Sequence, residues 1–121
     1  MMTGVSMSDQ KTKSQSEETV EDMLFCAEYQ QAIELIGRRW MGAILFALMA
    51  GPRRFNEIQS RIPGLSHRLL ATRLKELEEQ GIVVRKVITT SPIKVQYELT
   101  DAGLDLKNTV VAIMHWGEKW L

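Results

Sequence analysis

The 121-residue sequence is short of features that would place it outside the cell or in a membrane. Its single cysteine, Cys26, cannot form a disulfide within the chain, although an intermolecular one stays open, and a lone thiol fits a reducing compartment. The first part of the chain has no apolar run, which excludes a signal peptide or a membrane span there. We therefore expect a cytoplasmic protein that has no membrane segment.

The sequence also lacks the patterns that catalysis and metal binding need. The two histidines, His67 and His115, are far apart, and no cluster of Cys, His and Asp has the spacing of metal ligands. The eight glycines do not form a phosphate-binding loop, and no nucleophile stands beside a base. We expect no enzyme activity, no metal and no cofactor.

The net charge is zero, but the charges are segregated along the chain. Residues 1–22 carry two lysines against five acidic residues and show no hydrophobic periodicity, so we expect a disordered polar tail there and one domain over 23–121. Residues 53–94 carry nine arginines and lysines against four glutamates. This local excess of positive charge is typical of a surface that binds a polyanion.

Residues 54–81 predict two helices joined by a tight turn. Phe55, Ile58 and Ile62 have helical spacing, which indicates a short helix, and Pro63 with Gly64 ends it. The second helix is expected over 66–80, because Ser66 suits an N-cap and a glycine at 81 suits the position just after a helix. The arrangement is that of a helix-turn-helix.

The second helix has two distinct faces. Its predicted buried face consists of Leu69, Leu70, Leu74 and Leu77. Helical rotation places Arg68, Ala71, Thr72 and Lys75 on the opposite face, free to enter a DNA groove. Arg73 lies nearer the buried flank, where it either packs with its head paired to a carboxylate or contacts a phosphate. The pair Arg53 and Arg54 is either solvated or placed to hold a phosphate at a helix N-terminus.

Other helices are expected to form the core. Residues 27–36 have helical spacing and end at a glycine, and residues 40–50 are apolar on nearly all sides, so we expect a buried central helix that includes Trp40. The three tryptophans, at 40, 116 and 120, either pack or line a ligand cavity between the core and the last helix, and helical spacing favours packing.

A hairpin and a long last helix follow the helix-turn-helix. Residues 82–89 and 94–99 have the composition and alternation of strands, and they predict a hairpin joined by residues 90–93 that acts as a wing. Thr100 is expected to cap a helix that runs to Leu121. This helix carries more apolar surface than a small domain needs, so we expect a homodimer, which would present two recognition helices one DNA turn apart to a pseudopalindromic operator.

The whole pattern, from Cys26 onward, resembles the HxlR family of bacterial winged-helix transcriptional regulators, relatives of the MarR group. The residues that carry the resemblance are Cys26, Gly37 with Arg39 and Trp40, Gly51-Pro52, Arg54-Phe55-Asn56-Glu57, Pro63-Gly64-Leu65-Ser66, Leu74, Leu77-Glu78, Gly81, Val95, Tyr97-Glu98-Leu99-Thr100, Gly103 and Trp116-Gly117. Their order and spacing together are specific, although each piece alone is not.

The resemblance implies a fold, a function and a set of contacts. The fold is α+β and mostly helical, a winged helix-turn-helix with a C-terminal dimerisation helix, and the function is the binding of double-stranded DNA by a homodimer. The implied DNA-binding residues, with those that helical rotation adds, are Arg54, Ser66, His67, Arg68, Thr72, Arg73, Lys75 and Lys94. Dimerisation through the first and last helices implies an interface of Tyr29, Val110, Ile113, Met114, Trp116 and Trp120.

Two alternatives stay open at this stage. Some members of the family sense oxidants or electrophiles through a cysteine at the position of Cys26, whereas a small buried hydrophobe is the structural reading of the same residue. A winged-helix module that binds proteins and not DNA would use the same hairpin and last helix. The basic first part of the helix over 66–80, together with Arg54, favours DNA.

Overall fold

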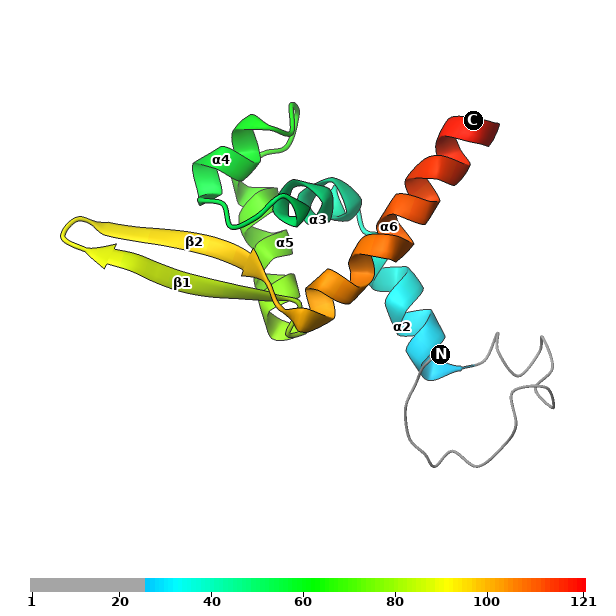
Figure 1. Ribbon diagram of the computed structural model, residues 1–121, viewed down its shortest axis with the longest axis horizontal. Helices are drawn as coiled ribbons and strands as arrows, with labels where there is room; N and C mark the ends of the chain where they lie inside the picture. Colours follow the sequence, from blue (N-terminus) through cyan, green and yellow to red (C-terminus); the bar gives the residue numbers. More distant parts are fainter. Residues whose placement is uncertain (1–25) are drawn as a thin grey trace. The chain divides into compact units, whose positions relative to one another are not determined.

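The computed structural model describes residues 26–121, so the predicted tail over 1–22 lies outside the described residues. The chain divides into two units after Ile36. The first contains helix α2 (Ala27–Ile36), which has the predicted bounds. The second contains the remaining elements, labelled in Figure 1: α3 (Met41–Met49), α4 (Phe55–Ser60), α5 (His67–Glu79), β1 (Val83–Thr90), β2 (Ile93–Leu99) and α6 (Asp101–Trp120). The predicted winged helix-turn-helix is confirmed.

Helix α3 buries one face, not its whole circumference. Met41, Ile44 and Leu48 are at most 2% exposed, and α3 contacts α4, α6 and β2. The predicted buried central helix is confirmed, but its apolar surface is not buried all round, since Phe46 is 53% exposed. Trp40 precedes the helix in a left-handed conformation with φ of 70° and is only half-buried.

The helix-turn-helix follows the predicted pattern with two differences. Helix α4 ends at Ser60, two residues before Ile62, which lies buried in the turn. The Ser66 hydroxyl accepts a hydrogen bond from the Leu69 N–H at 3.0 Å, and Gly81 has φ of 74°, so the predicted start and stop of α5 are confirmed. Leu70, Leu74 and Leu77 are buried, whereas Leu69, about 100° around the helix from Leu70, is half-buried.

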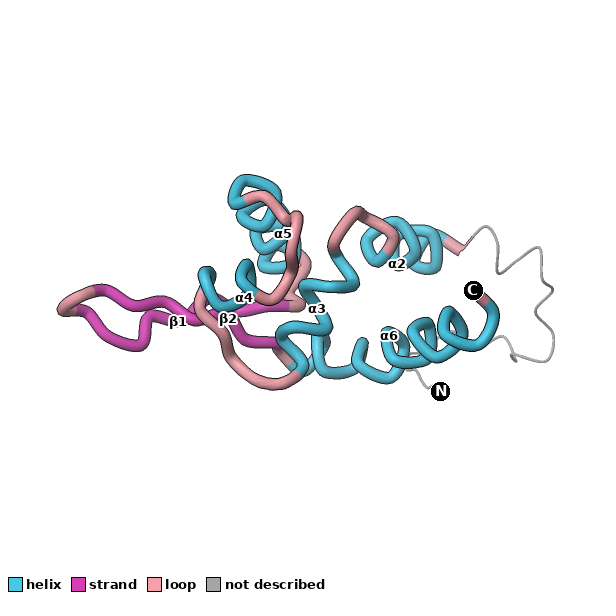
Figure 2. Tube along the Cα trace, turned by 90° about the horizontal axis from the view of Figure 1, so that it is seen from above, coloured by secondary structure: helices cyan, strands magenta, loops and turns pink. Residues whose placement is uncertain are grey.

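The two strands form the predicted hairpin, which projects as a wing in Figures 1 and 2. The pairing is antiparallel from Val83 with Leu99 to Thr90 with Ile93, and its register shifts between Val87 and Thr89. At the base of the wing, Arg53 pairs with Tyr97 through two main-chain hydrogen bonds of 3.0 and 2.8 Å. The segment before α4 is thereby tied to β2.

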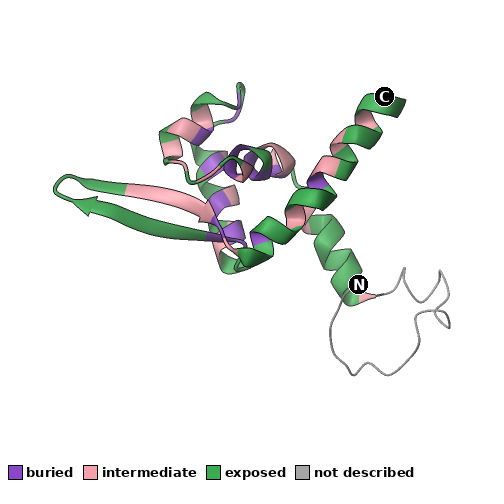
Figure 3. Ribbon diagram, in the orientation of Figure 1, coloured by how far each residue is buried: buried purple, intermediate pink, exposed green. Residues whose placement is uncertain are grey.

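Helix α6 begins where predicted, since the Thr100 hydroxyl accepts a hydrogen bond from the Gly103 N–H at 3.3 Å. A Cβ atom at Gly103 would collide with the Ile82 main-chain oxygen, so only glycine permits this approach of α6 to the start of the wing. Figure 3 shows the buried positions of the second unit gathered on α3, α5 and the base of the wing. Among the described helices, none is long and apolar enough to cross a bilayer.

Candidate nucleic-acid interface

The outer face of α5 is exposed over its whole length. Its residues are Arg68, Ala71, Thr72 and Lys75, all of them exposed, while the leucines on the other side form part of the core. The Thr72 hydroxyl donates to the Arg68 carbonyl at 3.1 Å. Among residues 26–121, neither the Arg68 guanidinium nor the Lys75 ammonium forms an ion pair or a side-chain hydrogen bond. This face, here called the α5 outer face, has the polarity and shape of a helix that enters a major groove.

Two residues at the start of α5 have structural duties as well. The Ser66 hydroxyl caps the helix. The His67 ring lies against the Phe55 ring, with centroids 4.4 Å apart and planes at 46°. This contact joins the first turn of α5 to the first turn of α4. Both side chains are exposed, which keeps them available to a ligand that approaches the N-terminal end of α5.

Arg73 does not belong to the α5 outer face. Its side chain is 15% exposed, its Nε donates to the Arg39 carbonyl at 3.0 Å, and its Nη1 lies 3.0 Å from Glu76 Oε1. Glu76 Oε1 also forms an ion pair with Arg38 Nη1 at 3.3 Å. These contacts match the packed alternative for Arg73, because the guanidinium is occupied inside the protein.

Arg54 stands at the N-terminus of α4 with its side chain 49% exposed. Its main-chain N–H donates to Glu57 Oε1 at 2.7 Å. That hydrogen bond is the chief reason why the pKa of Glu57 lies below its ordinary value, and the nearby charges of Arg54, Arg53 and Arg61 lower the pKa further. The Arg54 guanidinium also lies 4.0 Å from Glu57 Oε2, in an exposed ion pair.

The wing carries more positive charge than the predicted Lys94. Arg85 and Lys86 are exposed on β1, and Lys86 pairs with Glu98 at 2.9 Å. Arg85 makes no ion pair or side-chain hydrogen bond within the part of the chain that the structure describes. Both residues belong to the basic excess over 53–94, but neither is among the predicted DNA contacts. Their position on a two-stranded wing, where both faces meet solvent, could have indicated them.

Cys26 lies at the start of the first unit, just before α2. Its side chain is half-buried, and its thiol donates a hydrogen bond to Glu28 Oε1 at 3.1 Å. Since the thiolate is the nucleophile of cysteine chemistry, this contact belongs to the unreactive form of the residue. Cys26 belongs to the first unit, whereas the α5 outer face belongs to the second.

The last part of α6 exposes an apolar face. Ile113, Trp116 and Trp120 are 54%, 57% and 64% exposed and lie on one side of the helix, with Met114 half-buried beside them. Val110, also predicted for the dimer interface, is 8% exposed in the single chain, so its side chain packs mainly within the chain. On α2, Tyr29 is 49% exposed.

A basic, exposed recognition helix behind a tight turn, followed by a positively charged hairpin, defines the class of winged-helix DNA-binding proteins. The family model described as HxlR-like helix-turn-helix matches residues 35–121, and the chain belongs to this family. It is a DNA-binding transcriptional regulator, as the curated relatives at 40% identity and above also are.

The relatives cover most of the chain. The transcriptional regulator YodB of Bacillus subtilis is 42% identical over 78% of this chain and 85% of its own, and the regulator YvaP of the same organism is 40% identical over 79% and 89%. Among solved structures, reduced YodB superposes with a TM-score of 0.72 over 79% of this chain and 94% of that one. The redox regulator HypR in its reduced form, 35% identical, gives 0.72 over 77% and 92%.

Proposed function

We propose that two copies of the chain bind a pseudopalindromic operator, with α5 of each copy in the major groove and each wing on the adjacent groove or backbone. The observation that carries this proposal is the α5 outer face, which is exposed and basic while the leucines behind it are buried. A winged-helix module that binds only proteins would not need this face, and membership of a family of DNA-binding regulators disfavours that alternative.

The contacts divide by chemistry. Arg68 and Thr72 are placed to meet base edges, since a guanidinium pairs with guanine and a hydroxyl with several bases. Ser66, His67, Lys75, Arg54 and Lys94 are assigned to phosphates and sugars, to which we add Arg85 on the wing. Arg73 is left out because its guanidinium is held by Arg39 and Glu76.

The dimer would form through the exposed apolar face of α6, with Tyr29 of α2 contributing. Three residues more than half exposed on one helical face would be costly to leave in water, and a second copy would cover them. We further propose that residues 23–121 act as the regulator domain, with 1–22 as a tail, and that the protein works in the cytoplasm, which suits its single free thiol.

We also propose that the protein responds to an oxidant or electrophile that reacts with the Cys26 thiol. The thiol is partly accessible, and it is the chain's single cysteine. Solved forms of the relative YodB include a diamide-treated and a quinone-bound protein, each with a TM-score of 0.70 to this chain. Oxidation or alkylation would end the hydrogen bond from Cys26 to Glu28 and introduce a new group at the start of α2.

A fluorescence-anisotropy titration tests the core of this proposal. The purified protein is titrated against DNA from upstream of its own gene and against a scrambled duplex, at two salt concentrations. Selective binding whose log K falls linearly with log salt supports operator recognition, and the slope estimates the number of phosphates contacted. Equal, weak binding to both duplexes would contradict operator recognition at the chain's own promoter.

A further inference from the structure

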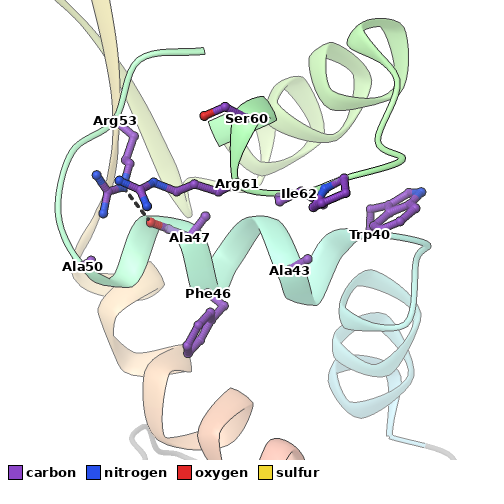
Figure 4. Close-up of a pocket in the computed structure, with 10 residues that line it drawn as sticks. Trp40, Ala43, Phe46, Ala47, Ala50, Arg53, Ser60, Arg61 and Ile62 are labelled. Atoms are coloured by element: carbon purple, nitrogen blue, oxygen red, sulfur yellow. Dashed lines mark hydrogen bonds between the residues drawn. The ribbon is translucent and has the colours of Figure 1, made fainter. Parts of the chain in front are cut away.

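The face of α3 that the core leaves uncovered opens onto a cavity of about 670 Å³, within the range of small-molecule sites. The cavity lies inside the second unit, between α3 and the turn that follows α4 (Figure 4). Residues 43, 46, 47 and 50 line it and recur at helical spacing; Phe46 among them is exposed, whereas Ala47 is buried at the border with the core.

One wall of this cavity is apolar. Trp40 stands at one end, Phe46 projects from α3, and the small side chains of Ala43 and Ala47 leave the space between them open. An apolar surface of this kind is costly to expose, and Trp40 and Phe46 offer ring faces to an apolar ligand.

The other end of the cavity is cationic. Arg53 and Arg61 both line it, and in Figure 4 their guanidinium heads lie toward one another near the Ala47 carbonyl, which accepts a hydrogen bond from Arg53 Nε at 3.3 Å. Neither guanidinium forms an ion pair with a carboxylate of residues 26–121. Both arginines help to lower the pKa of Glu57, but that carboxylate accepts its hydrogen bond from the Arg54 N–H.

The position of Arg53 is fixed before any ligand arrives. The main-chain N–H and carbonyl of Arg53 both form hydrogen bonds with the main chain of Tyr97, and its Nε donates to the Ala47 carbonyl. Two like charges that converge without a carboxylate between them repel each other, and an anion placed between them removes that repulsion. The fork of N–H groups on arginine suits a carboxylate or a similar planar anion.

We propose that this cavity binds a small organic anion with an apolar body, its carboxylate held by Arg53 and Arg61 and its body lying between Trp40 and Phe46. An inorganic phosphate or a DNA phosphate would use the arginines but leave the apolar wall uncovered. A neutral apolar compound would fill the wall and leave the arginines unpaired. Only a ligand with both parts satisfies both ends of the site.

A consequence for regulation rests on the proposed function of operator binding. Arg61, Ile62 and Pro63 belong both to the cavity and to the turn between α4 and α5. If a ligand that bridges α3 and this turn shifts the recognition helix, it changes the affinity for DNA, and DNA changes the affinity for the ligand by the same factor.

The test uses 2-naphthoate and its neutral analogue 2-naphthylmethanol, measured by isothermal titration calorimetry with the full chain. The wild type is expected to bind 2-naphthoate about tenfold or more tightly than the alcohol, because charge-assisted hydrogen bonds are formed only with the anion. The double variant Arg53→Gln, Arg61→Gln should lose this preference. Lys107→Gln removes the same kind of charge on exposed α6 and should keep it.

A second variant tests the apolar end. Ala43→Leu fills the space between Trp40 and Phe46 and should abolish binding of both compounds, and a thermal melt confirms that it folds. No binding of 2-naphthoate to the wild type, equal binding of acid and alcohol, or unchanged binding by the arginine variant would each overturn the proposal. A face covered by a second copy would give the first of these results.

Operator titrations with and without saturating 2-naphthoate separate this site from the proposed function. If the protein binds 2-naphthoate but does not select the operator, the proposed ligand site stands and the proposed operator recognition is contradicted. Operator selectivity without naphthoate binding would remove the site alone. If Arg53→Gln, Arg61→Gln lowers the salt dependence of DNA binding yet binds 2-naphthoate as the wild type does, the two arginines are phosphate contacts and the ligand site is wrong.

Discussion

Arg73 on the recognition helix donates from Nε to the main-chain carbonyl of Arg39, 34 positions earlier in the chain, at 3.0 Å. The acceptor belongs to the short segment that leads into α3. Glu76, one turn further along α5, pairs with both Arg73 and Arg38 at 3.0 and 3.3 Å. The recognition helix is therefore tied to the segment between α2 and α3, and a DNA phosphate could recruit Arg73 only by breaking these bonds.

Replacing Arg73 should lower stability and spare DNA binding. Arg73→Ala is expected to reduce the free energy of unfolding by about 2 kcal/mol, because it removes charge-assisted hydrogen bonds that are largely shielded from water. Lys75→Ala, on the exposed face of the same helix, should change it by no more than about 0.5 kcal/mol. Urea denaturation of the two variants measures both. Equal stability of the two would refute the structural role of Arg73.

Substitutions on the α5 outer face should distinguish a residue that contacts bases from one that contacts phosphates. Arg68→Ala is expected to weaken operator binding by roughly 1 to 3 kcal/mol and to reduce the preference over a scrambled duplex. Lys75→Ala should weaken binding to both duplexes alike and reduce the slope of log K against log salt by about one. Anisotropy titrations at several salt concentrations distinguish the two patterns. An Arg68→Ala protein with unchanged selectivity would remove Arg68 from base recognition.

Most of the fold followed from local sequence signals. The caps at Ser66 and Thr100 and the stop at Gly81 act through neighbouring backbone groups, so the sequence alone locates them. The uncovered face of α3 was not predictable in this way. Periodicity cannot tell an all-apolar helix that is buried on every side from one that lines a cavity, because that depends on which elements pack against it.

The site was harder to predict than the fold for the same reason. Helical rotation correctly placed Arg68 and Lys75 on an exposed face. It left Arg73 undecided, because the deciding partner, the Arg39 carbonyl, is distant in sequence. Val110 was predicted for a dimer interface from the apolar stripe of the last helix and from the family resemblance. Neither signal tells how much of its side chain packs within its own chain, where it is 8% exposed.

The free energy of unfolding should fall at acidic pH in part because Glu57 becomes protonated. Its pKa in the folded protein lies below the ordinary value of 4.5, chiefly because the Arg54 N–H bonds its carboxylate. The ionised group therefore contributes stability above pH 4.5, and this contribution is lost as pH falls from there through the lowered pKa.

Glu57→Gln isolates this contribution. The difference in urea midpoint between the wild type and the variant should favour the wild type at neutral pH and shrink as the pH falls below about 4.5. Other carboxylates titrate alike in both proteins, so the difference cancels them. A midpoint difference that stays constant from neutral to acidic pH would show that the Arg54 N–H does not favour the charged form.

The exposed face of α6 should control assembly. Trp116→Glu places a charge beside Ile113 and Trp120 and is expected to raise the dissociation constant of the proposed dimer by about tenfold or more, because burying an unpaired charge costs more than about 1.4 kcal/mol. Leu104→Glu serves as the control, since Leu104 is 53% exposed on α6 about 180° around the helix from Ile113. Sedimentation equilibrium measures both. A wild type that is monomeric at micromolar concentration would contradict the dimer itself.

Oxidation should release DNA only when Cys26 is present. Diamide takes two electrons from two thiols and is itself reduced to the hydrazine, so two copies of a chain with a single cysteine can be joined by a disulfide between their Cys26 sulfurs. The wild type should then lose operator affinity and regain it with dithiothreitol, whereas Cys26→Ser, which keeps a hydroxyl donor toward Glu28, should bind DNA equally before and after treatment. Non-reducing electrophoresis reports the covalent dimer alongside the anisotropy titration. Identical loss of binding in both proteins would assign the effect to another residue, and a covalent dimer that still binds DNA fully would show that Cys26 reacts without regulating.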